Sequence, residues 1–75
     1  MSMLPVLSGH EVVKVLVSMG WSVTRQRGSH IILTKLGEPA TLSVPDHKEV
    51  ARGTLRSLLR SANLTTNEFV AHAQE

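Results

Sequence analysis

The sequence predicts an α+β domain made of one helix, a three-stranded antiparallel meander and two further helices. Two capping boxes, Ser8-x-x-Glu11 and Thr65-x-x-Glu68, mark the starts of the first and last helices. Between them, alternating segments separated by glycine turns indicate strands, and a leucine stripe indicates another helix. Helices packed on one face of such a sheet cover that face and leave the other open to solvent.

The first helix is expected to begin at Ser8 and to end near Gly20. Its residues on one side of the helical wheel are Val12, Leu16 and Met19. This apolar side would pack on the sheet.

Three strands are expected to follow. Residues 21–27 alternate, which places one set on one face and the other set opposite: Trp21, Val23, Arg25 and Arg27 against Ser22, Thr24 and Gln26. Gly28-Ser29 forms a tight hairpin turn into a second strand over residues 30–35. A turn over residues 36–39 leads to a third strand over residues 40–44, which Pro45 ends.

The second helix is expected to start between Val50 and Gly53 and to run to Ala62. Its buried stripe is Leu55, Leu58, Leu59 and Ala62. Beside that stripe lies a row of three arginines at helical spacing, called here the arginine row: Arg52, Arg56 and Arg60. In the short last helix, Phe69 and Val70 are expected to dock on the core.

A chain of 75 residues is interpreted as a single small domain, residues 1–75, with a thin core that a protein partner would help to support. It has no cysteine, which excludes disulfides and thiolate-bound zinc. No stretch approaches the ~20 apolar residues that span a bilayer, so no membrane association is expected. The N-terminus also lacks the layout of a signal peptide, and we expect a cytoplasmic protein.

The positive charge is segregated although the net charge is only +2. Two stretches of the chain contain basic residues and no acid: Lys14, Arg25, Arg27 and Lys35 in the first, and the arginine row in the second. Such segregation attracts phosphate groups or an acidic protein. The alternative is an ordinary solvated surface.

The stretch Arg27-Gly28-Ser29-His30 delivers a histidine to the first position of an apolar strand. If Ile31 and Leu33 face the helices, the His30 ring faces the open side of the sheet, where a ligand can reach it. Imidazole moves protons near neutral pH, so His30 is a candidate general acid or base. A half-buried histidine without function is the competing interpretation.

Other candidate residues have simpler interpretations. Ser29 lacks the acid that would complete a catalytic triad, so it is interpreted as a turn residue. His47 follows Val44-Pro45-Asp46 in a connecting loop, either as a second proton-transfer group or as a polar loop residue. Trp21 is interpreted as a core residue and not as a platform for base stacking. The four histidines show no metal-ligand spacing, so no metal and no other cofactor is expected.

Several motifs in this order and spacing resemble the HicA family of bacterial toxin–antitoxin systems, over almost the whole chain. They are the Ser8-Gly9 helix start, Gly28-Ser29-His30, Val44-Pro45-x-His47, and Gly53-Thr54-Leu55-Arg56-x-Leu58-Leu59-Arg60 with Leu64-Thr65 and Glu68-Phe69. The resemblance implies a fold similar to the double-stranded-RNA-binding domain, an mRNA-cleaving activity, and neutralisation by a HicB antitoxin. It also implies that His30 is catalytic, with Gly28 and Ser29 as motif neighbours.

The expected function is therefore that of a metal-independent endoribonuclease toxin that acts on mRNA in the cytoplasm. Arg25, Arg27, Gly28, Ser29, Lys35 and the arginine row are the expected RNA-binding residues, and His47 is a possible accessory residue. Two alternatives need no catalysis. One is an RNA-binding module that reads RNA through 2′-hydroxyl and phosphate contacts, and the other is a basic domain that docks an acidic protein.

Overall fold

A computed structural model describes residues 4–74, so the ends of the predicted domain, residues 1–3 and 75, lie outside the described part. The elements are α1 (Gly9–Ser18), β1 (Ser22–Arg27), β2 (His30–Thr34), β3 (Leu42–Pro45), α2 (Arg52–Ser61) and α3 (Thr66–Ala73). The strands form one antiparallel sheet in the order β1-β2-β3. This confirms the predicted α+β meander, which has the element order of a double-stranded-RNA-binding domain.

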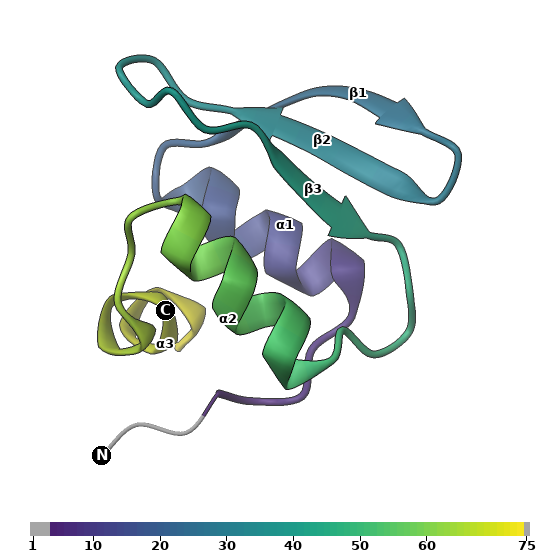
Figure 1. Cartoon of the computed structure of the whole chain (residues 1–75). Helices are drawn as coiled ribbons and strands as arrows, with labels where there is room; N and C mark the ends of the chain where they lie inside the picture. The colour runs from purple at the N-terminus through teal and green to yellow at the C-terminus, as the bar shows by residue number, and fades with distance from the viewer. Residues whose placement is uncertain (1–3, 75) are drawn as a thin grey trace.

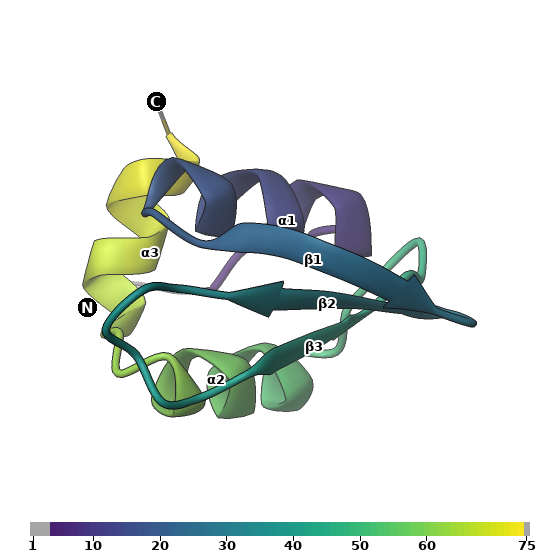
Figure 2. The same cartoon turned by 90° about the horizontal axis from the view of Figure 1, so that it is seen from above.

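The helices cover one face of the sheet (Figure 1). Viewed from above the sheet, α1 runs along the β1 side, α2 runs along the β3 side, and α3 lies across one end (Figure 2). Helix α1 contacts β1 and β3, α2 contacts β3, and α3 contacts both α1 and α2. Within residues 4–74, no helix or strand covers the opposite face of the sheet, as predicted.

Both predicted capping boxes are present. In α1 the Ser8 hydroxyl accepts from the Glu11 N–H at 3.1 Å, while the Glu11 carboxylate accepts from the Ser8 N–H at 2.9 Å. Thr65 and Glu68 form the same reciprocal pair at the start of α3. These hydrogen bonds satisfy N–H groups that the first turn of a helix leaves without a partner.

Helix α1 ends at a glycine, as predicted. Gly20 has φ of +102°, its N–H donates to the Val17 carbonyl, and the Trp21 N–H donates to the Leu16 carbonyl. This pair of bonds is the Schellman motif, which reverses the chain after a helix. The chain can therefore enter β1 directly with Trp21 pointing into the core.

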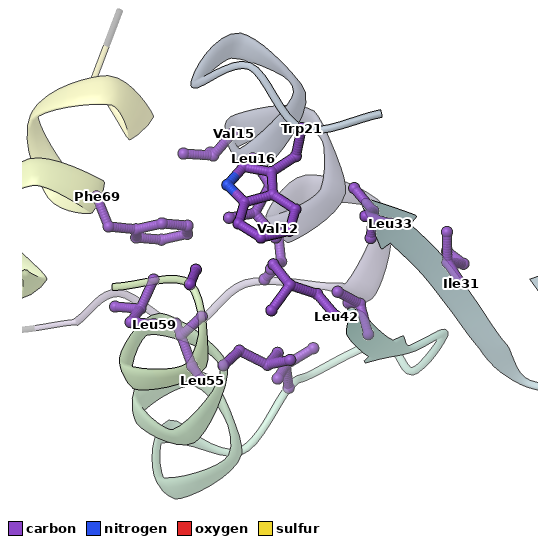
Figure 3. Packing of buried hydrophobic residues seen from close by; sticks show 14 of the residues in the cluster. Val12, Val15, Leu16, Trp21, Ile31, Leu33, Leu42, Leu55, Leu59 and Phe69 are labelled. Atoms are coloured by element: carbon purple, nitrogen blue, oxygen red, sulfur yellow. The ribbon is translucent and has the colours of Figure 1, made fainter. Parts of the chain in front are cut away.

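The core lies between the sheet and the three helices (Figure 3). Trp21 and Phe69 point toward each other there, which confirms that Trp21 is a core residue. The predicted stripe of α2 is buried as a whole: Leu55, Leu58, Leu59 and Ala62. From the sheet, alternate residues of β2 and β3 point into this core: Ile31, Leu33, Leu42 and Val44.

The predicted strict alternation of residues 21–27 is wrong. The pairing of β1 with β2 shifts between Val23 and Arg25, so Val23 lies opposite Leu33 whereas Arg25 lies opposite Ile32. Leu33 is fully buried on the helix face and Ile32 belongs to the open face. The extra residue at this β-bulge is Thr24, and it moves the arginines to the face opposite Val23.

The third strand is also displaced from its predicted range. It starts two residues later, at Leu42, because its partner residue in β2 is Leu33 and β2 ends at Thr34. It ends at Pro45, which pairs with His30. Within residues 4–74, no helix is long and apolar enough to cross a membrane.

Candidate active site

His30 occupies the first position of β2, directly after the hairpin turn. Gly28 has φ of +56°, a conformation that glycine adopts without the steric cost of a side chain. The Gln26 side-chain amide donates to the Gly28 carbonyl at 3.2 Å and closes the turn. Because Ile31 and Leu33 are buried, alternation places the His30 ring on the open face.

The His30 side chain is exposed, which removes the half-buried interpretation. Among residues 4–74, no hydrogen bond or ion pair of the imidazole is present. Both ring nitrogens are therefore accessible for exchanging a proton with a ligand.

Basic and small polar residues surround this ring. Arg27 lies directly opposite His30 on β1, and Arg25 lies opposite Ile32, which pairs with Ser43 on β3. A shallow hollow on the open face is lined by Arg27, His30, Ile32 and Ser43, and no carboxylate is among these lining residues. The arrangement combines a proton-transfer group with a cationic surface, which suits an anionic ligand.

Backbone contacts fix the turn that precedes His30. The Asp46 N–H donates to the Ser29 carbonyl at 2.7 Å, and the Gly9 N–H donates to the His47 carbonyl at 2.9 Å. His10 and Asp46 form a pair at 3.0 Å, with the histidine side chain 75% and the aspartate 29% exposed. The segment after β3 therefore connects the hairpin turn to the start of α1.

Gly9 permits this contact because it has no side chain. A Cβ at this position would lie 2.2 Å from the Pro45 carbonyl oxygen and 3.0 Å from the Asp46 Cα. The start of α1 thus packs directly on the backbone that leads from β3 to α2. No local signal in the sequence links Asp46 to His10, which lies 36 positions earlier.

His47 lies in this loop with an exposed side chain, and its backbone carbonyl is the group that the structure ties to α1. Its predicted accessory role stays a prediction. Among residues 4–74, no cluster of three or more histidine, cysteine or acidic side chains could hold a metal ion.

Two groups of predicted RNA-binding residues lie away from His30. The Lys35 amine donates to the Met19 carbonyl at 3.0 Å, beyond the far end of β2. The arginine row lies on α2, which packs against the opposite face of the sheet (Figure 2). In that row the Arg52 guanidinium donates to the Leu4 carbonyl at 3.0 Å. The structure therefore groups only Arg25, Arg27 and the turn residues with His30.

The capping carboxylates of α1 and α3 have lowered pKa values. The Ser8 backbone N–H, and then its side chain, lower the pKa of Glu11. The Thr65 backbone N–H and side chain act on Glu68 in the same way and lower its pKa. A carboxylate that accepts hydrogen bonds is favoured in its charged form. These shifts belong to helix capping and not to the site.

Comparisons with known proteins identify the family of this chain. The family described as the HicA toxin of bacterial toxin–antitoxin systems matches residues 9–64. A solved structure described as a toxin–antitoxin complex from Streptococcus pneumoniae contains a chain 36% identical to this one, with a TM-score of 0.68. That similarity covers 77% of this chain and 98% of the other. No curated protein matches the sequence. Since the family match spans most of the chain, including the whole sheet and α2, this protein belongs to the HicA toxin family.

Proposed function

We propose that this toxin is an endoribonuclease that cleaves mRNA, with His30 as its catalytic residue. The observation that carries the proposal is the exposed His30 ring on the open face, with Arg27 beside it and no carboxylate lining the hollow. A carboxylate there would repel a phosphodiester, whereas the arginine attracts it.

RNA supplies its own nucleophile, so the protein needs only proton transfer and charge stabilisation. The 2′-oxygen attacks phosphorus, the bond from phosphorus to the 5′-oxygen breaks, and the products are a 2′,3′-cyclic phosphate and a 5′-hydroxyl. One proton leaves the 2′-hydroxyl and one reaches the 5′-oxygen. His30 performs one of these transfers and water performs the other, while Arg27 stabilises the additional negative charge of the transition state.

We also propose that an acidic antitoxin protein binds this toxin and covers His30. The similar chain from Streptococcus pneumoniae belongs to a toxin–antitoxin complex. The cationic open face is the surface that RNA needs, so carboxylates of an inhibitor bound there would exclude phosphate by charge as well as by shape. With mRNA as substrate, the proposed location is the cytoplasm.

The central test compares purified wild-type protein with His30→Ala and His30→Gln in an RNA cleavage assay. General acid–base catalysis contributes about 10²–10⁴-fold, so both variants should lose activity by that factor. Since the side chain is exposed, their circular dichroism spectra should match the wild type. Cleavage within threefold of the wild type, in preparations free of contaminating nuclease, would overturn the assignment of His30.

The chemistry has a separate test. Cleavage should continue in excess EDTA and should fail on an RNA carrying 2′-deoxyribose at the scissile position, because the 2′-hydroxyl is the nucleophile. Loss of activity on chelation that added metal restores would contradict the mechanism. RNA binding without cleavage by the wild-type protein would favour the non-catalytic binding module.

A further inference from the structure

In β1, an apolar residue and two arginines that belong on opposite faces of the sheet have the spacing of residues on one face. Val23, Arg25 and Arg27 are separated by two residues each, and in a regular strand they would share one face. Val23 pairs with the fully buried Leu33, on the side of the helices. If the arginines followed it, their charges would point toward the core side and away from His30.

The β-bulge at Thr24 resolves this conflict. The pairing of β1 and β2 passes from Val23 opposite Leu33 to Arg25 opposite Ile32, so Thr24 is the additional residue. The Thr24 hydroxyl donates to the Ile32 carbonyl at 3.2 Å. A side-chain donor thus binds the neighbouring strand at the point where the bulge interrupts the regular ladder.

The bulge decides which residues meet on the open face. After it, alternation places Arg25 beside Ile32 and Arg27 beside His30, and all four side chains point away from the helices. Two residues along a strand span about 6.7 Å, which is close to the separation of successive phosphates along an RNA strand. The backbone positions of the two arginines are therefore spaced about as far apart as two neighbouring phosphates.

We propose that Thr24 is a positioning residue whose bulge places Arg25 and Arg27 to hold two successive RNA phosphates. Arg27 holds the phosphate that reacts at His30, and Arg25 holds the next phosphate, above Ile32. This inference rests on the proposed ribonuclease function, since it assigns the phosphate contacts of the same site. Arg25 contributes to RNA binding and Arg27 to binding and to the reaction.

The first experiment measures RNA binding without cleavage, using a 2′-O-methyl RNA oligonucleotide and fluorescence anisotropy over a range of salt concentrations. Each phosphate contact on a single strand contributes about 0.7 to the slope of log affinity against log salt. Arg25→Gln and Arg27→Gln together should lower that slope by about 1.4. An unchanged slope in this double variant would overturn the proposal, whatever the role of Thr24.

The second experiment tests Thr24 itself. Thr24→Val keeps the β-branched shape and removes the hydroxyl. It should weaken binding about tenfold because Arg25 and Arg27 are no longer held on the open face. Thr24→Ser keeps the hydroxyl and should bind within twofold of the wild type. Thr34→Val is the matched control, since Thr34 lies at the other end of β2 and its side chain donates no hydrogen bond within the described chain.

Two further readouts separate positioning from a merely structural role. In cleavage assays Thr24→Val should raise KM and lower kcat, because the bulge places both Arg25 and Arg27, and Thr24→Ser should restore both constants. Adding Arg25→Gln to Thr24→Val should weaken binding less than it does in the wild type, because the guanidinium is already displaced.

Equal losses in Thr24→Val, Thr24→Ser and Thr34→Val, or full additivity of the double variant, would overturn the proposal. If Thr24→Val fails to fold by circular dichroism, Thr24→Ala replaces it, with the same expected loss and the same rescue by serine. Failure of the proposed function is distinguishable, because His30→Ala would then retain cleavage while the binding effects of Thr24 persisted.

Discussion

Replacing Gly9 by alanine tests whether the contact between α1 and the segment after β3 supports the fold and the site. A Cβ at Gly9 would meet the Pro45 carbonyl oxygen at 2.2 Å, and no flexible side chain is available to move aside. The backbone would have to separate, which would also break the bond from the Gly9 N–H to the His47 carbonyl.

The expected cost follows from three contributions. Forcing a methyl group into a packed contact costs about 1–3 kcal/mol. Loss of the hydrogen bond adds about 1 kcal/mol. Replacing glycine by alanine in a helix returns about 0.4–1 kcal/mol through the unfolded chain. We therefore expect Gly9→Ala to lower the free energy of unfolding by about 2 kcal/mol. For a domain of this size that corresponds to a fall in Tm of roughly 8–16 °C.

Gly53 provides the matched control. It also lies in the first turn of a helix, α2, but no atom lies within 4 Å of a Cβ built there. Gly53→Ala should therefore raise the free energy of unfolding by about 0.4–1 kcal/mol. Thermal or urea unfolding followed by circular dichroism measures both. A Gly9→Ala protein as stable as Gly53→Ala would refute the close contact between α1 and the loop.

Gly9→Ala should also reduce RNA cleavage at temperatures where the protein stays folded. The Pro45–Asp46 backbone that must move is bonded through the Asp46 N–H to the Ser29 carbonyl, next to His30. Displacing His30 from its productive position by a fraction of an ångström costs activity even when the residue is present. Full activity in the folded variant would show that this connection does not position the histidine.

Two other predictions concern charge. Glu11 and Glu68 have lowered pKa values in the folded chain, so their contribution to stability is present above the ordinary value of 4.5 and is lost as pH falls through the folded value. The double variant Glu11→Gln with Glu68→Gln keeps both caps, and its free energy of unfolding should depend less on pH below pH 4.5. The same pH dependence as the wild type in this range would contradict these shifts. Changing all three arginines of the arginine row to glutamine should weaken binding of RNA or of the antitoxin. The slope of log affinity against log salt should fall by about 0.7–0.9 per lost contact. Unchanged affinity and slope for both ligands would show that the row is only a solvated surface.

Local signals in the sequence were sufficient to predict the helices and the order of the elements. The capping boxes and the glycine that ends α1 act within one turn of chain, so they predict helix boundaries without knowledge of the fold. The leucine stripe of α2 and the alternation in β2 likewise report which side of each element is buried. The position of His30 on the open face followed from that alternation alone.

The tertiary structure decided which charged residues share the site. Lys35 and the arginine row lie in the same acid-free basic stretches of the sequence that suggested a common binding surface with Arg27. In the structure Lys35 lies beyond the far end of β2, and the arginine row lies on the helix side of the sheet. Charge segregation along a chain does not specify distance in space, since the packing of α2 on the sheet is what separates these groups. The contact of Gly9 with Pro45 is equally non-local.

The orientation of Arg25 and Arg27 is the clearest case. Strict alternation placed them on the face of Val23, and a single additional residue at Thr24 reverses that placement. A strand has a period of two, so one inserted residue changes the face of every residue after it. The sequence contained a hint, because an apolar valine and two charged arginines shared one parity, but the pairing with β2 determined where the shift occurs. The sequence by itself therefore determined the order of the elements, the helix caps and the position of His30 on the open face. The residues that lie beside His30 were decided by the register between the strands, because that register depends on contacts between distant residues.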